Sequence, residues 1–248
     1  MEDSDIKFFE NDLQLMSKAS NYLDWQVRLI KPYLRGVQLE IGAGVGNFTK
    51  SLARDSISHI AIEPDIFCFK QLLQKTSDQD NVTVLNIRSE ELPQETDLPS
   101  KFDSIVALNV LEHIEDDKEA ICSWGKMLTQ HGNIILLVPY GEWLYGAIDQ
   151  RLHHHRRYSK QMVLELAKNA GFKIVHFNYI NCLGMWAWYW NNKIAKRSHQ
   201  NSQQIFIFDK LIVPWLSRLE SLIPPPFGQS IFVVLGKDSK FNSHRFPN

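Results

Sequence analysis

The chain has 248 residues, of which 44% are hydrophobic and 22% are charged, a size and balance that fit one folded α/β domain. Its 27 Lys and Arg nearly cancel its 28 Asp and Glu, and the formal net charge of -1 provides no overall positive field for a nucleic acid partner. The acidic, polar start and the lack of an apolar run of about 18 residues predict a cytoplasmic protein without a signal peptide or a spanning segment.

Three cysteines, Cys68, Cys122 and Cys182, are widely spaced and lie outside any C-x-x-C pattern. An odd number with this spacing predicts neither a disulfide framework nor a zinc site. We therefore expect three reduced, half-buried thiols.

Short apolar segments alternate with amphipathic segments along the chain, beginning with an amphipathic stretch at 22–34. This alternation predicts a mainly parallel sheet covered by helices on both faces. One expected helix follows Ser159, a good N-cap, and ends before Gly171, a good C′ residue. Strands are expected at 37–41, 59–62, 82–87, 104–108, 133–138, 172–179 and 230–235, and helices at 48–54, 66–74, 117–128 and 162–170.

The segment 39–47 reads LEIGAGVGN and stands between an expected strand and an expected helix. Its glycines allow a sharp turn and close approach of a ligand to the backbone, although a purely structural turn needs glycine as well. The spacing is G-x-G-x-G, with Glu40 two residues ahead. Nicotinamide-dependent enzymes have G-x-G-x-x-G instead, and Asn47 replaces their last glycine. The pattern favours a ligand-binding turn and argues against an NAD-dependent oxidoreductase.

A second acid, Glu63, ends the next expected strand in the segment IAIEPD at 60–65. It follows Glu40 by 63 − 40 = 23 residues, close to the ~20 residues expected for a ribose-binding acid. A carboxylate at this place can accept hydrogen bonds from both hydroxyls of a ribose. The alternative is a solvated acid at the end of a strand.

These motifs, followed by FDSIV at 102–106 and NVLEHI at 109–114, make residues 20–180 resemble the class I S-adenosylmethionine-dependent methyltransferases. The resemblance implies a Rossmann-like three-layer α/β/α sandwich, with a mostly parallel seven-stranded sheet and an antiparallel last strand. It also implies one domain over 1–248, with an N-terminal cap helix at about 10–35 and an aromatic insertion at about 182–227 before the last strand.

The resemblance further implies S-adenosylmethionine as cofactor and S-adenosylhomocysteine as product. Glu40 and the glycine turn border the methionine end, Glu63 holds the ribose, residues 89 and 90 flank the adenine, and Asn109 offers its backbone carbonyl to the ammonium group. Aromatic residues of the cap helix, Tyr22 and Trp25, cover the cofactor or else pack in the core. The cofactor-binding residues predicted in this way are Tyr22, Glu40, Gly42, Ala43, Gly44, Glu63, Pro64, Ser89, Glu90 and Asn109.

The stretch from 138 to 159, with its run LHHHRRYS, and the segment PPPFGQS at 224–230 resemble a bacterial subgroup associated with polysaccharide or secondary-metabolite pathways. His153 stands where that subgroup usually has glycine. Consecutive side chains point in different directions, so the three histidines at 153–155 cannot share one ion and we expect no metal. Two interpretations of the arginines stay open: with His154 they bind an acidic substrate group, or they pair with Asp149 and Glu142 as structural anchors.

Methyl transfer from a sulfonium is an in-line displacement, so positioning supplies most of the catalysis and a base helps where the acceptor is a hydroxyl. His113 is the first candidate for a catalytic base, because it follows the fourth expected strand at the edge where ligands bind. His154 is the second. Alternatively, His113 shapes the pocket without moving a proton. We expect a small-molecule or metabolite acceptor, with O-methylation favoured over N or C.

Four aromatic residues of the insertion, Trp186, Trp188, Tyr189 and Trp190, form a dense group. They indicate a helical flap that packs on the core, or an apolar surface for the acceptor or for lipid. An apolar or acidic acceptor and a peripheral membrane contact both stay open.

The sequence bears on three further classes of protein. A nucleic acid methyltransferase that modifies amino groups is disfavoured, because NVLE at 109–112 replaces an Asn/Asp-Pro-Pro-aromatic run. A protein or peptide methyltransferase and a non-catalytic S-adenosylmethionine-binding scaffold stay as alternatives. Turnover of bound cofactor separates the scaffold from an enzyme.

Overall fold

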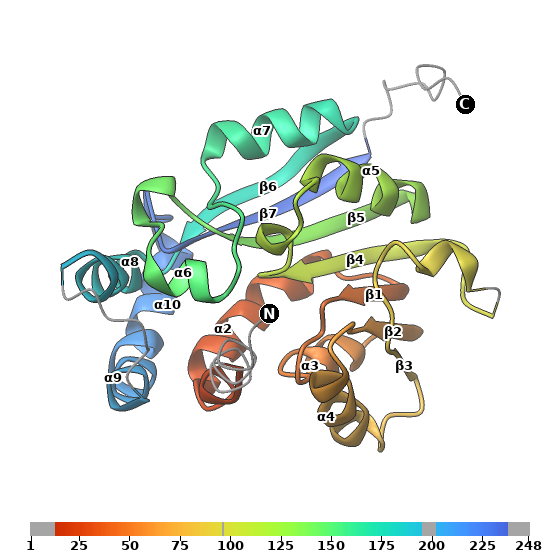
Figure 1. Cartoon of the computed structure of the whole chain (residues 1–248), viewed down its shortest axis with the longest axis horizontal. Coiled ribbons are helices and arrows are strands. Elements are labelled where there is room, and N and C mark those ends of the chain that lie inside the picture. The colour runs from red at the N-terminus through yellow and green to blue at the C-terminus, as the bar shows by residue number, and fades with distance from the viewer. Residues whose placement is uncertain (1–12, 96, 195–201, 238–248) are drawn as a thin grey trace.

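The computed structural model describes residues 13–95, 97–194 and 202–237 (Figure 1). Within these residues, seven strands form one sheet in the order β3-β2-β1-β4-β5-β7-β6. The strands are β1 Val37–Ile41, β2 Ser58–Ile62, β3 Val82–Leu85, β4 Phe102–Leu108, β5 Leu128–Pro139, β6 Phe172–Ile180 and β7 Ser230–Lys237.

The strand directions follow the predicted pattern. The strands from β1 to β5 pair in parallel, and β7 lies between β5 and β6, antiparallel to both. The prediction of a mostly parallel seven-stranded sheet with an antiparallel last strand is therefore confirmed.

Alternate residues of the central strands face two different layers of helices, because the side-chain period of a strand is two. In β5, Ile134 and Leu136 belong to a buried cluster with α5 and α7. Ile135 and Leu137 belong to a second cluster with α2, α3 and α10. Figure 1 shows α5 and α7 on one side of the sheet and α2 and α3 on the other. These helices are α2 Ser20–Ile30, α3 Thr49–Ala53, α5 Asp117–Met127, α7 Lys160–Asn169 and α10 Val213–Leu222.

Some predicted boundaries were wrong by a few residues. The helix expected at 117–128 ends one residue earlier, because Leu128 already pairs with Phe102 across a bulge and opens β5. The helix expected from 162 begins at Lys160, because the hydroxyl of Ser159 caps it by accepting a hydrogen bond from the Met162 amide. The strand β3 ends two residues before 87.

The insertion between β6 and β7 is mostly helical in its described part. It contains α8 Cys182–Tyr189, η5 Trp190–Ile194, α9 Ser202–Ile207, η6 Phe208–Ile212 and α10. Residues 10–12 of the expected cap helix and 195–201 of the expected insertion lie outside the described residues. The other short elements are η1 Lys31–Tyr33, α4 Ile66–Thr76, η2 Leu92–Gln94, η3 Leu111–His113, η4 Glu142–Leu144 and α6 Ala147–Arg151.

No disulfide joins Cys68, Cys122 and Cys182, all of which lie in the described part of the chain, as predicted. Cys122 and Cys182 are half-buried, whereas Cys68 on α4 is fully buried. Among the helices of the described ranges, none combines the length and the apolar character that crossing a membrane requires.

Candidate functional site

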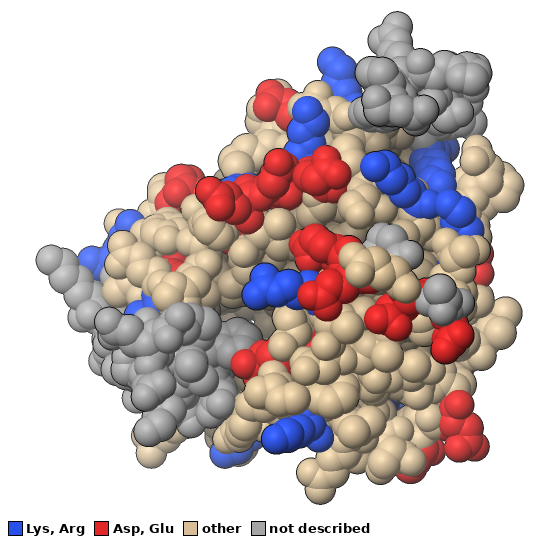
Figure 2. Space-filling model, turned by 45° about the vertical axis from the view of Figure 1, so that its right-hand side comes forward, with Lys and Arg blue, Asp and Glu red and all other residues tan. Residues whose placement is uncertain are grey.

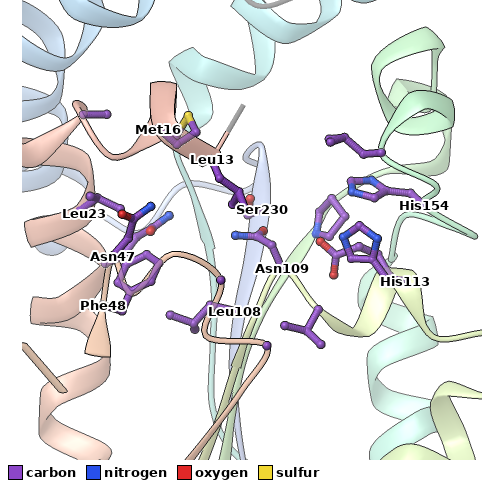
Figure 3. A pocket seen from close by; sticks show the side chains of 18 of the residues that line it. Leu13, Met16, Leu23, Asn47, Phe48, Leu108, Asn109, His113, His154 and Ser230 are labelled. Atoms are coloured by element: carbon purple, nitrogen blue, oxygen red, sulfur yellow. The ribbon is translucent and has the colours of Figure 1, made fainter. Parts of the chain in front are cut away.

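A cavity of about 1210 Å³ lies at the edge of the sheet where the parallel strands β1, β2 and β4 end. This edge is where ligands bind in open α/β folds. In Figure 3, Leu23 and Phe48 lie on one side of the cavity and His113 and His154 on the other. All twelve site residues predicted from the sequence line it: Tyr22, Glu40, Gly42, Ala43, Gly44, Glu63, Pro64, Ser89, Glu90, Asn109, His113 and His154.

The glycine turn after β1 needs glycine for two different reasons. Gly42 has φ 66°, and a Cβ there would lie 2.5 Å from Cγ2 of Val110, so both conformation and space exclude a side chain. Gly44 has φ 56°, but the nearest neighbours of a Cβ would be the methyl groups of Leu13 at 3.8 and 3.9 Å. The backbone at Gly44 is therefore bare toward the cavity.

The carboxylate of Glu63 lies directly after β2 and is held by backbone groups. It accepts hydrogen bonds from the Gly44 amide at 2.8 Å and the Asp65 amide at 2.9 Å. Burial raises the pKa of Glu63, and these two hydrogen bonds partly oppose the rise. Asn86 donates to the Glu63 carbonyl at 2.8 Å. The carboxylate is thus fixed between the glycine turn and the start of α4.

Glu40 is buried in a polar row that crosses two strands. Its Oε2 lies 3.0 Å from Nε2 of His59, whose Nδ1 lies 3.0 Å from Oε1 of Gln38. Both Glu40 and His59 are almost fully inaccessible to solvent. His59 was not among the site residues predicted from the sequence. It pairs with Gln38 across β1 and β2, so its side chain lies on the same face of the sheet as Glu40.

The two aromatic residues predicted on the cap helix lie in different places. Tyr22 lines the cavity, and burial raises the pKa of its hydroxyl. Trp25 is buried in the cluster with α3 and α10 and does not line the cavity. Asp209 of η6 accepts a hydrogen bond from the Tyr22 amide at 2.9 Å, so the insertion supplies the N-terminal cap of α2.

Three non-glycine residues of the described ranges have positive φ: Asn109 at 53°, His153 at 55° and Asn181 at 63°. All three line the cavity. Residues in this conformation store strain, and such residues cluster at functional sites. His153 stands where the resembled subgroup has glycine, and it takes up the backbone conformation that glycine prefers.

A buried cluster of titratable groups forms the far wall of the cavity. The rings of His113 and His154 meet edge to face, with centroids 4.7 Å apart. Nδ1 of His154 lies 2.9 Å from Oδ1 of Asp149. Burial lowers the pKa of His113 to about 3, so its ring is neutral near pH 7 and a weak base. Asp149 has a lowered pKa: burial opposes ionisation, but the hydrogen bond from His154 and the charge of Arg157 outweigh it.

Glu112 is the functional candidate that the sequence analysis missed. Its side chain is fully buried, and neither carboxylate oxygen has a hydrogen-bond partner. Burial raises its pKa to about 7. Perturbed carboxyls of this kind are frequent in functional sites. The signal in the sequence was an acid in an otherwise apolar turn after β4, next to His113.

The structure favours the anchoring interpretation of the two arginines. Nε of Arg157 lies 2.8 Å from Oδ1 of Asp149, and its guanidinium stacks over the ring of Trp188 at 4.7 Å. Arg156 pairs with Asp117 at 2.8 Å instead of the acids expected from the sequence. Arg157 nevertheless lines the cavity.

The aromatic group of the insertion is divided between the inside and the surface. Trp188 and Trp190 line the cavity, and Trp188 stacks with Arg157. Trp186 and Trp190 are 55% and 60% exposed. On the face shown in Figure 2, acidic and basic side chains are interspersed, so that face presents no extended basic strip for a phosphate backbone.

Comparison with known proteins finds a likeness for the central part of the chain. Residues 39–134, which include the glycine turn, Glu63, Asn109 and the turn after β4, match the family described as "Methyltransferase domain". The matched segment is less than half of the chain, and it is similar to that family. A curated relative described as an uncharacterized methyltransferase, from Alkaliphilus oremlandii (strain OhILAs), is 24% identical over 156 residues. That match covers 59% of this chain and 63% of the relative, so the chain spans less than two thirds of the relative's length.

Solved structures resemble the fold of this chain. A SAM-dependent methyltransferase from Thermotoga maritima has a TM-score of 0.62 and 16% identity, covering 94% of this chain and 97% of its own. One from Clostridium acetobutylicum has a TM-score of 0.56 and 12% identity, with 88% and 91% covered. Magnesium protoporphyrin IX methyltransferase from Synechocystis, solved with bound SAH, has a TM-score of 0.55 and 12% identity, with 89% and 84% covered. These likenesses establish a Rossmann-like fold.

Proposed function

We propose that this chain transfers a methyl group from S-adenosylmethionine to a small-molecule acceptor, with a hydroxyl favoured as the accepting group. One observation carries the proposal: a single cavity joins the glycine turn and Glu63 to the wall formed by His113 and His154. Pockets for one ligand usually measure ~300–1,000 Å³. A cavity of about 1210 Å³ has room for a donor and an acceptor together.

The cofactor half of the proposal rests on backbone conformation and on one carboxylate. The methionine end would lie against the bare backbone of Gly44, and the ribose hydroxyls would donate to Glu63. Glu63 already accepts two hydrogen bonds and is nearly buried, so its carboxylate is held in place before a ligand arrives. Ser89 is buried at the cavity wall and Glu90 is exposed beside it, where an adenine edge would lie.

The acceptor half rests on the opposite wall. Asp149 fixes the ring of His154 through Nδ1, which leaves Nε2 as the nitrogen that could take a proton from an acceptor hydroxyl. Trp188 and Ala187 of α8 add apolar surface to the same cavity. We therefore favour an acceptor with an apolar part, and the run at 152–159 supports the bacterial subgroup associated with polysaccharide or secondary-metabolite pathways.

The outer surface of the insertion supports contact with an amphipathic acceptor or with the membrane that holds it. Trp215, Leu211 and Leu222 are 73%, 66% and 81% exposed. Apolar side chains on the outside of a helical segment bind interfaces through their buried area.

The test of the proposal is calorimetric titration with S-adenosylhomocysteine and, separately, with NAD. Two hydrogen bonds to a charged carboxylate contribute about 1.5–3 kcal/mol each, so Glu63→Ala should weaken S-adenosylhomocysteine binding at least about tenfold. The affinity of Glu63→Gln for S-adenosylhomocysteine should lie between those of the wild type and Glu63→Ala, because glutamine keeps one acceptor oxygen. Glu119→Ala, on the exposed face of α5, is the control and should bind like the wild type.

Binding of NAD, or of neither ligand, would contradict the proposal and return the glycine turn to a structural role. If S-adenosylhomocysteine binds, incubation with methyl-labelled S-adenosylmethionine and pools of small hydroxylated acceptors follows. Labelled product from small molecules supports the proposal. Label found only in polypeptide, or bound cofactor that no acceptor consumes, would favour a protein methyltransferase or a scaffold.

A further inference from the structure

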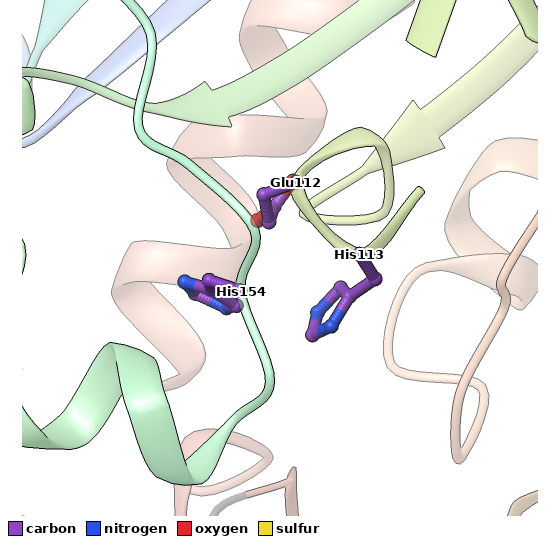
Figure 4. Close-up of side chains that lie close together, drawn as sticks. All are labelled: Glu112, His113 and His154. Atoms are coloured by element: carbon purple, nitrogen blue, oxygen red, sulfur yellow. The ribbon is translucent and has the colours of Figure 1, made fainter. Parts of the chain in front are cut away.

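The three side chains Glu112, His113 and His154 lie together at one end of the cavity (Figure 4). Each offers one ligand atom, and the three atoms lie within 4.8 Å of one another. Glu112 and His113 come from the turn after β4, whereas His154 comes from the loop after α6. The cluster therefore exists only in the folded chain.

We propose that Glu112, His113 and His154 bind one divalent transition-metal ion, with Zn²⁺ as the reference ion. Two imidazoles and one carboxylate form the ligand set of several catalytic zinc sites and of non-haem iron sites. The donor types exclude a preference for Ca²⁺ or Mg²⁺, which favour all-oxygen sites.

The surroundings of the Glu112 carboxylate favour a bound ion. The carboxylate is completely buried, and both of its oxygens lack a hydrogen-bond partner. A buried charge without a partner is costly, and native proteins keep one where a ligand or an ion satisfies it. Arg157 is not available as an ion-pair partner of Glu112, because its Nε already lies 2.8 Å from Oδ1 of Asp149.

The orientation of the His113 and His154 rings also favours a bound ion. Asp149 occupies Nδ1 of His154, and the rings of His154 and His113 meet edge to face with centroids 4.7 Å apart. Metal-binding histidines usually have their second nitrogen held by a carboxylate or a carbonyl, as Asp149 holds that of His154. The remaining nitrogens and the Glu112 carboxylate belong to residues that line the same cavity.

The three ligand atoms need to move only slightly closer together to bind one ion. Metal to ligand bonds of about 2.0–2.2 Å place neighbouring ligand atoms roughly 3.0–3.5 Å apart. Ligand atoms within 4.8 Å of one another would thus move by somewhat over 1 Å at most. The histidines at 153–155 would still not share the ion, because only His154 of that run takes part.

The consequence for chemistry rests on the function proposed above, although metal binding itself does not. An ion in this place would have open positions toward the cavity, and a hydroxyl acceptor bound there would lose its proton more easily. His154 would then be a ligand and not a base, so the two roles exclude one another. Metal titration without cofactor separates them.

The test uses the tag-free full chain, stripped with chelator and dialysed. We expect calorimetry with Zn²⁺ to give one ion per chain, and Co²⁺ to give a visible spectrum. Loss of one ligand should weaken binding at least about 10–100-fold, so Glu112→Gln and His113→Asn should each show that loss. His155→Asn is the matched control: it removes an exposed histidine of the same run, keeps the backbone bond to the Glu112 carbonyl, and should bind like the wild type.

A second measurement does not depend on the variants folding. X-ray absorption of the wild type loaded with Zn²⁺ should contain scattering from two imidazoles. Absence of binding at 100-fold excess metal, a spectrum without imidazole, a response to Mg²⁺ alone, or equal affinity in all variants would overturn the metal site. S-adenosylhomocysteine titration of the same samples tests the proposed function separately.

Discussion

Gly44→Ala offers the sharpest test of the role assigned to the glycine turn. The new methyl group would meet only the Leu13 methyls, at 3.8 and 3.9 Å, so it fits the empty protein sterically. The remaining cost is backbone: φ is 56°, and the left-handed region costs a residue with a Cβ about 1–2 kcal/mol. For a domain of this size, that lowers the melting temperature by roughly 2–8 °C.

Cofactor binding should suffer separately from stability, because the methyl group would stand in the cavity where the backbone is bare. Forcing a methyl group into a filled site costs about 1–3 kcal/mol, or roughly 5- to 150-fold in affinity. Thermal unfolding and calorimetry with S-adenosylhomocysteine measure the two effects.

Gly171→Ala is the matched control for the backbone cost. Gly171 has φ 75°, follows α7 and does not line the cavity. It should lose a similar amount of stability and keep its affinity. Unchanged affinity in Gly44→Ala, or an equal loss in both variants, would refute the assignment of the turn to the cofactor.

Three further predictions concern buried carboxylates. Asp209→Asn should destabilise the chain by about 1–3 kcal/mol in urea unfolding. Asp209 accepts from the Tyr22 amide at Oδ1 and from the Asn21 side chain at Oδ2, and an Asn side chain keeps only one of these acceptors; an unchanged midpoint would contradict the cap. Glu220→Gln should speed hydrogen exchange at the start of α8, since its two oxygens accept from the amides of residues 181 and 182 at 2.9 Å; equal protection would speak against it. The pKa of Glu112 is raised from 4.5 to about 7, so the folded metal-free chain holds this proton more tightly than the unfolded chain. The contribution of Glu112 to the free energy of unfolding is full below about pH 4.5 and falls by about 3 kcal/mol as the pH rises to about 7. Glu112→Gln should flatten the dependence of unfolding free energy on pH. An equal pH dependence in the variant would show that Glu112 is not its cause.

The cofactor side of the cavity could be predicted from the sequence because local rules place it. Residues that directly follow parallel strands meet at one edge of the sheet. The glycine turn, Glu63 and Asn109 each follow a strand whose boundary was recognisable from its apolar run. The structure brings these residues together in one cavity, and their roles toward a ligand stay a prediction.

The far wall could not be predicted in the same way. His113 and His154 are separated by 154 − 113 = 41 residues, and the loop that returns His154 to the turn after β4 follows no periodic pattern. The buried state of Glu112 was equally hidden, because a lone acid in a turn is usually solvated. For Trp25 the sequence left two alternatives open, and the structure shows the core alternative: it stands one helical turn from Tyr22, yet the rotation around the helix directs it into the core.

The insertion is the part of the chain whose importance the sequence understated. Asp209 caps α2 through the Tyr22 amide, and Glu220 caps α8 through the amides that follow β6. Both carboxylates are buried, and both elements that they fix line the cavity. Removing a buried charge partner leaves helix amides unsatisfied, so loss of the Asp209 carboxylate would weaken the start of α2 and loss of the Glu220 carboxylate would weaken the start of α8. The insertion is therefore a structural part of the site, since two walls of the cavity depend on its carboxylates.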